Sequence, residues 1–193
     1  MNSICVYCGS SSGRKEEYRL AAESLGSELA RRGITLVYGG GNVGLMGVVA
    51  DAALAAGGKV IGVIPRALLE KELGHDGLTE LRVVGSMHER KAQMAELADG
   101  FIALPGGFGT LEEFSEIATW TQLGFHRKPL GLLNVGGFYD GFLAFLDHAE
   151  VEGFIRPQHR SIVLSSTASG ELIDRLTSFH LPYLHKWIDR DQR

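Results

Sequence analysis

Cysteine is scarce in this chain, which has two, Cys5 and Cys8, among 193 residues. Two thiols cannot complete a four-cysteine zinc site. The C-x-x-C spacing is typical of a redox pair where the second thiol begins a helix. Here Cys5 belongs to an apolar run, residues 4–7, whose side chains should alternate between faces as in a strand. We therefore expect two ordinary thiols in a reducing compartment.

An excess of positive charge, long apolar runs and metal-binding patterns are also missing. The formal net charge is −4, whereas nucleic-acid-binding proteins usually carry a basic face, so no nucleic-acid partner is expected. No apolar run reaches the roughly 18 residues of a membrane span, and the start of the chain lacks the charged region of a signal peptide. The histidines are scattered without metal-ligand spacing. We expect a cytoplasmic protein with no membrane partner, no metal and no other cofactor.

The chain does contain a regular alternation of strand-like apolar runs and helical patterns, which is typical of βαβ units. We predict a single nucleotide-binding α/β domain over residues 1–193, with a C-terminal tail at 180–193. Its fold would be Rossmann-like: a doubly wound parallel sheet of about six or seven strands with helices on both faces. The predicted strands are residues 4–7, 35–38, 60–64, 81–84, 101–104, 130–134 and 162–164. The predicted helices are residues 18–29, 45–56, 87–98, 111–123 and 139–150, and residues 66–79 are predicted to be a loop or short helix.

Three strand-to-helix turns are rich in glycine: residues 8–13, 39–44 and 105–110. Because the carboxyl ends of parallel strands lie at one edge of the sheet, the three turns should meet there. Glycine permits close approach of the backbone, and amide groups at a helix N-terminus favour an anion. We expect a phosphate-bearing ligand at this edge, with Gly9, Ser10, Gly40 and Gly41 among its contacts.

The second turn, Gly39 to Gly44, matches G-x-G-x-x-G and leaves a dinucleotide site open. Such sites usually carry an acidic residue about 20 positions later, at the end of the next strand, where it holds the ribose. Arg66 follows that strand here, which argues against NAD and leaves NADP open. Alternatively, Gly39 to Gly41 bind no ligand and only allow a helix to pack closely on a strand. For Gly44 and Gly47 we favour this packing explanation.

The third turn is more specific. Residues 105–113 fit the motif P-G-G-x-G-T-x-x-E, and some 20 residues upstream the segment 87–91, M-H-E-R-K, puts an Arg-Lys pair at a helix start. In the order and spacing of these two motifs the chain resembles the LOG (Lonely Guy) family of cytokinin-activating enzymes. The similarity runs from the first strand through Val135 and is weak beyond Gly153.

The resemblance implies a cytokinin riboside 5′-monophosphate phosphoribohydrolase, which splits an adenosine 5′-monophosphate into free base and ribose 5-phosphate. It implies Arg90 and Glu113 as the catalytic residues, and a homodimer. The substrate-binding residues that we predict, besides those of the first two turns, are Met87, Gly106, Gly107, Phe108, Gly109 and Thr110. The resemblance implies three more: Glu72 and Lys91 beside the base and ribose, and Thr119 facing the same cavity. The sequence does not indicate whether the base is plain adenine or N6-modified.

Both motifs also have a simpler explanation as helix caps. Thr110 to Glu113 is a T-x-x-E capping box, and Ser86 to Glu89 is an S-x-x-E one. Capping gives no reason for two cations at the positive end of a helix dipole, where each is unfavourable by roughly 0.3–1 kcal/mol. A bound anion would remove that penalty, which favours a ligand role for Arg90 and Lys91. Glu112, about 100° round the helix from Glu113, is expected to be mainly solvated.

The residue types suit the implied chemistry. Breaking an N-glycosidic bond builds positive charge on the ribose and negative charge on the leaving base. The carboxylate of Glu113 would stabilise the cation and orient water, and Arg90 would hold phosphate or ribose oxygens. Amides of the 107–110 turn would bind the 5′-phosphate, so the bare nucleoside should not react.

Two other functions stay open at this stage. Sequences with this P-G-G turn have been labelled PLP-dependent lysine decarboxylases, which need a Schiff-base lysine. The lysines, at positions 15, 59, 71, 91, 128 and 186, lie in no recognisable PLP context. A non-catalytic nucleotide or cofactor carrier would bind without cleaving, and the presence of both Arg90 and Glu113 argues against it.

Overall fold

The computed structural model describes residues 1–72 and 74–181, and of Glu72 it describes the backbone only. Within that part of the chain, all seven strands run parallel in one sheet, in the order β4-β3-β2-β1-β5-β6-β7. The strands are β1 (Ser3–Tyr7), β2 (Thr35–Tyr38), β3 (Val60–Pro65), β4 (Glu80–Val84), β5 (Gly100–Ala103), β6 (Leu130–Leu133) and β7 (Val163–Ser166). Each predicted strand is confirmed with ends that differ by at most two residues. Of the predicted tail, residues 182–193 lie outside the described residues.

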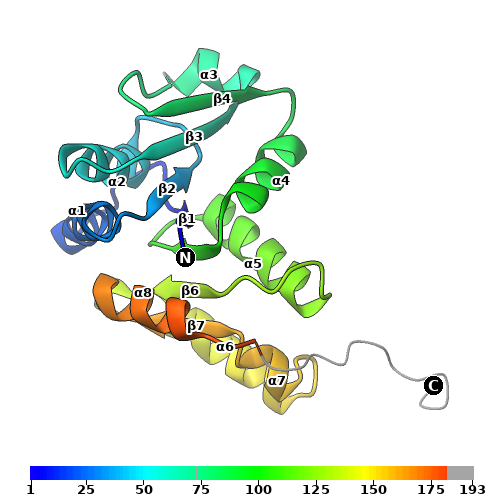
Figure 1. Cartoon of the computed structure of the whole chain (residues 1–193). Helices are drawn as coiled ribbons and strands as arrows, with labels where there is room; N and C mark the ends of the chain where they lie inside the picture. The colour runs from blue at the N-terminus through cyan, green and yellow to red at the C-terminus, as the bar shows by residue number, and fades with distance from the viewer. Residues whose placement is uncertain (73, 182–193) are drawn as a thin grey trace.

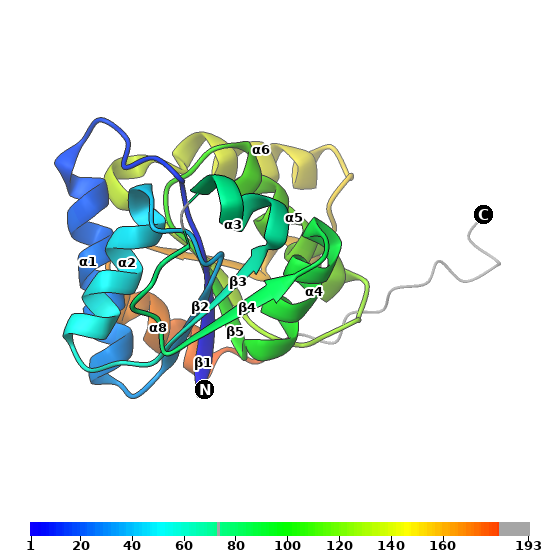
Figure 2. The ribbon, with the colours of Figure 1, turned by 90° about the horizontal axis from the view of Figure 1, so that it is seen from above.

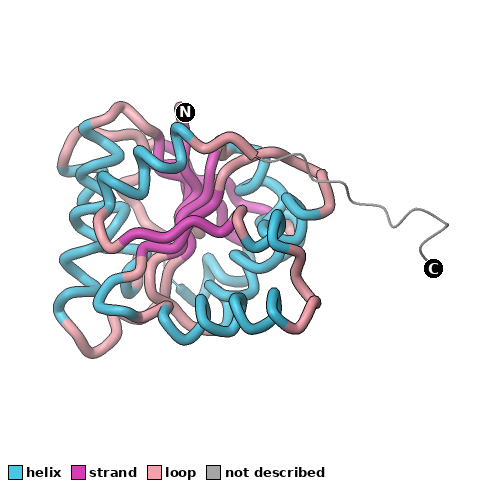
Figure 3. The backbone as a smooth tube through the Cα atoms, turned by 90° about the horizontal axis from the view of Figure 1, so that it is seen from below, coloured by secondary structure: helices cyan, strands magenta, loops and turns pink. Residues whose placement is uncertain are grey.

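Helices cover both faces of this sheet (Figures 1 and 2). One face carries α1 (Glu16–Arg31), α2 (Gly44–Ala55) and α8 (Ser169–Ser178), and the other carries α4 (Met87–Leu97), α5 (Phe108–Gln122) and α6 (Asp140–Val151). Seen from below, the strands form a twisted central layer between the helices (Figure 3). The predicted doubly wound, Rossmann-like fold is confirmed. No helix in the described part is long and apolar enough to cross a membrane.

Shorter elements complete the fold. The segment predicted as a loop or short helix begins with α3 (Arg66–Glu72), and η1 (Val135–Gly137) and α7 (Pro157–Arg160) are single short turns. Helix α8 was not predicted, although its buried side chains, Leu172, Ile173 and Leu176, stand at helical spacing.

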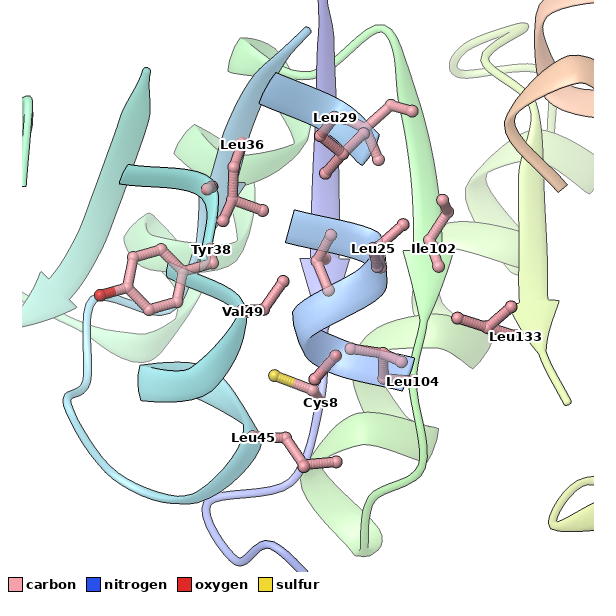
Figure 4. Close-up of a cluster of buried hydrophobic side chains, with 14 of the residues drawn as sticks. Cys8, Leu25, Leu29, Leu36, Tyr38, Leu45, Val49, Ile102, Leu104 and Leu133 are labelled. Carbon is pink, nitrogen blue, oxygen red and sulfur yellow. The ribbon is translucent and has the colours of Figure 1, made fainter. Parts of the chain in front are cut away.

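The side chains of β1 alternate between two hydrophobic cores. Ile4 and Val6, followed by Cys8, contribute to the core beneath α1 and α2, part of which is drawn in Figure 4. Cys5 and Tyr7 contribute to the core beneath α4 and α5. Both cysteines are free and buried. Because they lie on opposite faces of the sheet, they do not form the redox pair that the C-x-x-C spacing left open.

The strand order reverses at β1. Strands β1 to β4 are laid outward in one direction, and the chain then returns to place β5 on the other side of β1. Ligands of open α/β sheets bind beyond the carboxyl ends of the strands at such a reversal. There the amide of Gly9 donates to the carbonyl of Pro105 (3.1 Å), and the amide of Leu45 donates to the carbonyl of Gly9 (3.0 Å). The turns that follow β1, β2 and β5 therefore meet, as their position after parallel strands predicted.

Candidate active site

A cavity of about 270 Å³ lies where α4 and α5 begin, at the carboxyl edge of the sheet. The residues predicted for the site that line it are Gly9, Ser10, Met87, Arg90, Gly107, Phe108, Gly109, Thr110 and Glu113. The two helix starts therefore open onto one cavity, and a guanidinium and a carboxyl group from separate helices both line it.

Backbone carbonyls hold the guanidinium of Arg90. Its Nε donates to the carbonyl of Val63 within β3, and its Nη2 donates to the carbonyl of Gly39 after β2, both at 3.1 Å. Arg90 is 8% exposed, and no carboxylate of the described chain forms an ion pair with it. A guanidinium has five N–H donors. The side chain is thus fixed in place while its positive charge stays available to an anion in the cavity.

Glu113 lies in the second turn of α5 and is partly buried. Burial raises the pKa of Glu113 to about 7. The positive charge of Arg90 acts to lower this pKa but is outweighed, and the neighbouring carboxylate of Glu112 raises it further. An ordinary glutamate has a pKa of about 4.3. A carboxyl group that titrates near neutrality beside a cation in a cavity is typical of catalytic acids and bases.

The start of α5 differs from the prediction. The helix begins at Phe108, three residues earlier than expected, and its N-cap is Gly107. Thr110 and Glu113 are therefore inside the helix, and the capping box read from T-x-x-E is wrong. Thr110 instead packs against the turn, since an ideal β-carbon on Gly106 would lie 2.1 Å from its Oγ1. Helix capping consequently does not explain Glu113.

The Ser86 half of the predicted capping box at α4 is confirmed, whereas the carboxylate of Glu89 binds the amide of Gly85 in place of that of Ser86. Oγ of Ser86 accepts from the amide of Glu89 (3.1 Å), and the carboxylate of Glu89 accepts from the amide of Gly85 (2.7 Å). These bonds fix the first turn of α4, from which Arg90 extends.

The first residues of α5, Phe108, Gly109 and Thr110, line the cavity. In any helix the first N–H groups have no partner within the helix, and in α5 the first such bond is Leu111 N–H to the carbonyl of Gly107 (3.1 Å). Ideal β-carbons on Gly107 and Gly109 would meet nothing within 4 Å. The space beside Gly107 and Gly109 is thus open, and free amides with the helix dipole suit an anion. Phosphate binding at this turn stays a prediction.

Lys91 does not line the cavity. Its Nζ lies 2.5 Å from the carboxylate of Glu112 and 3.1 Å from that of Glu116, so it links α4 to α5. Burial acts to lower the pKa of Lys91, but its bonds to the two carboxylates outweigh burial and raise that pKa above its usual value. Glu112, expected to be mainly solvated, has a 56% exposed side chain and also forms this ion pair. Direct contact of Lys91 with a substrate stays a prediction.

Gly40 and Gly41 lie outside the lining of this cavity. They hold the segment that follows α3, because the carbonyl of Gly40 accepts from the amide of His75 (3.2 Å) and Gly41 forms an antiparallel bridge with Gly74. These two contacts join the second glycine-rich turn to the 74–75 segment. Direct contact of Gly40 or Gly41 with a substrate stays a prediction.

The remaining predicted residues are distributed as follows. Gly106 lines an adjoining cavity of about 280 Å³, which shares Gly9, Ser10 and Gly107 with the first. Thr119 faces another cavity, among α5, α6 and α7, and is not brought to Arg90 and Glu113. The side chain of Glu72 lies outside the described residues.

Sequence reasoning missed three residues of the cavity wall, Cys8, Met46 and Glu112. Cys8 directly follows β1, and Met46 lies two residues after the second glycine-rich turn. Their positions at the carboxyl edge were therefore a usable signal. Gly39 was assigned to phosphate binding or backbone packing, whereas its carbonyl accepts from Arg90 and a β-carbon there would collide with the guanidinium.

Comparison with known proteins identifies similar chains. A family model described as "Possible lysine decarboxylase" matches residues 46–176. Cytokinin riboside 5′-monophosphate phosphoribohydrolase LOG of Oryza sativa subsp. japonica is 56% identical over 176 residues, which cover 91% of this chain and 73% of the rice protein. An Arabidopsis thaliana protein with the same enzyme name is 54% identical, over 91% of this chain and 81% of its own.

Solved structures share the fold. The molybdenum cofactor binding protein from Rippkaea orientalis superposes with a TM-score of 0.69 at 24% identity, over 92% of this chain and 96% of that one. The molybdenum cofactor carrier protein from Chlamydomonas reinhardtii gives a TM-score of 0.69 at 20% identity, over 92% and 99% of the two chains. At these identities the likeness concerns the fold alone.

Proposed function

Since this chain belongs to the LOG family of cytokinin riboside 5′-monophosphate phosphoribohydrolases, we propose that it hydrolyses the N-glycosidic bond of adenosine 5′-monophosphates. The products are the free base and ribose 5-phosphate, and the base is adenine or an N6-modified adenine. The observation that carries the proposal is the convergence of Arg90 and Glu113 on one cavity beside the open amides of α5.

The 5′-phosphate binds at the start of α5, where the amides of the 107–110 turn and the helix dipole favour a dianion. Arg90, whose guanidinium is held by two backbone carbonyls, supplies a fixed positive charge to phosphate or ribose oxygens. Binding energy from the phosphate, which does not react, then orients the ribose against Glu113.

The reaction breaks the bond between the anomeric carbon and the base nitrogen. The electron pair of that bond leaves with the base, and the ribose takes on positive charge. Glu113 in its carboxylate form stabilises this cation and accepts a proton from the attacking water, whose oxygen bonds to the anomeric carbon. One water is consumed, and its two hydrogens end on the departing base and on the new hydroxyl of ribose 5-phosphate.

Lysine decarboxylation, the activity in the description of the matching family model, has no comparable support. A Schiff-base lysine must lose its proton at neutral pH, which needs a lowered pKa. Lys91 is the lysine beside the candidate site, and its two carboxylate partners raise its pKa instead.

The proposal also includes a single domain, a homodimer and a cytoplasmic location. The resemblance to the LOG family implies the dimer, and large apolar side chains that are exposed just after α5 and along and after α6 support it, namely Phe125, Phe145, Val151 and Phe154. Sedimentation equilibrium of the purified protein tests the dimer directly, and a mass equal to one chain at micromolar concentration contradicts it.

The experiment that tests the activity is to incubate the purified chain with AMP and with N6-isopentenyl AMP and to separate the products by chromatography. We expect free base and ribose 5-phosphate in equal amounts. Retained binding of both nucleotides without release of base would contradict the proposal and indicate a carrier.

A further inference from the structure

The turn that follows β6 reaches across to the end of β5, where the P-G-G turn (residues 105–107) begins. The hydroxyl of Tyr139 donates to the backbone carbonyl of Leu104 at 2.6 Å, from 35 positions further along the chain. Tyr139 is 1% exposed and Leu104 is fully buried. Burial raises the pKa of Tyr139 above its usual value of about 10, so the hydroxyl keeps its proton and acts as the donor.

This hydrogen bond holds one side of the entry to the P-G-G turn. On the other side, the amide of Leu104 donates to the carbonyl of Tyr7 (2.9 Å), and the amide of Gly9 donates to the carbonyl of Pro105 (3.1 Å). The pairing of β5 with β6 ends before Leu104, and Pro105 has no N–H to donate. On the β6 side, therefore, the hydroxyl of Tyr139 fixes the chain where the sheet no longer does.

Tyr139 is itself fixed by its own turn. Its amide donates to Oδ1 of Asn134 (2.7 Å), and Nδ2 of Asn134 donates to the carboxylate of Asp140 (2.7 Å). The rings of Tyr139 and Phe138 meet edge to face, with centroids 5.0 Å apart. Phe138 lines the adjoining cavity of about 280 Å³, as do all three residues of the P-G-G turn. The 134–139 turn is thus a rigid neighbour of the P-G-G turn.

The P-G-G turn is packed closely against the residues on either side of it. An ideal β-carbon on Gly106 would lie 2.1 Å from Oγ1 of Thr110 and 2.9 Å from the amide nitrogen of Gly9. Gly107 is the N-cap of α5. Because close-packed parts of a protein transmit displacements, a shift of the Leu104 carbonyl is passed to the start of α5.

We infer that Tyr139 is a positioning residue for the 5′-phosphate of the substrate. Its hydroxyl fixes the peptide that leads into the P-G-G turn and thereby holds the first residues of α5 in the arrangement that binds phosphate. Tyr139 lines neither of the two adjoining cavities, so it acts through the turn. The inference rests on the proposed function in one respect, that the phosphate binds at the start of α5, and it does not depend on cleavage of the glycosidic bond.

Tyr139→Phe tests the inference, because it keeps the ring and removes the hydroxyl. Tyr38→Phe is the matched control, since Tyr38 is also fully buried but its hydroxyl has no hydrogen-bond partner among the described residues. Both variants and the wild type, labelled with ¹⁵N, are titrated with ribose 5-phosphate, which carries the phosphate, and with adenosine, which lacks it. The titrations are followed by NMR.

We expect Tyr139→Phe to raise the Kd of ribose 5-phosphate by about tenfold, because the buried Leu104 carbonyl loses its donor. The Kd of adenosine should stay within about twofold of the wild type, and Tyr38→Phe should change neither value. The NMR spectra and urea unfolding check that the variants are folded. If Tyr139→Phe does not fold, Asn134→Ala replaces it with the same expected result, because it removes the acceptor that holds the Tyr139 amide.

Three results would overturn the inference. They are unchanged binding of ribose 5-phosphate in the folded variant, equal weakening of both ligands, as a general loss of structure would produce, and no binding of ribose 5-phosphate by the wild type. Failure of the wild type to release adenine from AMP, with the selective loss of ribose 5-phosphate binding still seen in Tyr139→Phe, would contradict the proposed hydrolysis and support the positioning role.

Discussion

Nη2 of Arg90 occupies the space that a side chain on Gly39 would need. An ideal β-carbon on Gly39 would lie 1.9 Å from that nitrogen, and the carbonyl of Gly39 accepts a hydrogen bond from the same nitrogen at 3.1 Å. One glycine thus both admits the guanidinium and anchors it. The second anchor, the carbonyl of Val63, leaves little freedom for the side chain to move aside.

Gly39→Ala is therefore predicted to displace Arg90 and to lower kcat/KM for AMP by about 100-fold, the typical effect of a displacement of about 1 Å in an active site. Steady-state hydrolysis of AMP measures it. Gly141→Ala is the control, because Gly141 lies in α6 where an ideal β-carbon meets nothing within 4 Å. Equal activity of both variants would show that the position of Arg90 does not matter.

The pH dependence follows from the raised pKa of Glu113. The carboxylate is the active form in this mechanism, so kcat/KM should rise with pH and level off above the pKa of about 7. The 5′-phosphate of the substrate also titrates, with a pKa near 6. The titration of Glu113 is distinguished from that of the phosphate by comparing variants of the protein on the same substrate, because only the Glu113 titration then shifts.

Two charge-removing variants should move this rise in opposite directions. The positive charge of Lys91 lowers the pKa of Glu113, so Lys91→Met should shift the rise to higher pH. The negative charge of Glu112 raises the pKa of Glu113, so Glu112→Gln should shift it to lower pH. Profiles of kcat/KM measured from pH 5 to about 9 test both shifts, and coincident profiles would exclude Glu113 as the titrating group.

The open amides of α5 predict strong dependence on the 5′-phosphate. Adenosine lacks the group that those amides bind, so its kcat/KM should fall at least about 1,000-fold below that of AMP, with part of the loss in kcat. Parallel assays of the two substrates at equal enzyme concentration measure this ratio. Comparable rates would mean that the turn at Gly107 and Gly109 has another purpose.

The sequence predicted the strands and the meeting of the three turns because both depend on local pattern. Apolar runs mark buried parallel strands, and every turn after such a strand lies at the same edge. Arg90 and Glu113 were also placed correctly in one cavity, since each extends from a helix start at that edge.

Other features depend on distances between elements, which the sequence does not contain. The carbonyl anchors of Arg90 come from Val63 and Gly39, and any residue has a carbonyl. The ion pairs of Lys91 with α5 depend on the spacing of two helices. Thr119 is a different case: it is six residues after Glu113, hence about 240° round the helix, and this angle alone predicts that the two face different ways.

The account depends above all on the carboxylate of Glu113, and Glu113→Gln tests it most directly. The substitution keeps the shape of the side chain and removes its charge. We predict that Glu113→Gln binds AMP as tightly as the wild type, by calorimetry, and releases adenine about 100 to 10,000 times more slowly, while Glu112→Gln stays within about tenfold of the wild type at pH 8. Release of adenine by Glu113→Gln at the wild-type rate would contradict the proposed mechanism.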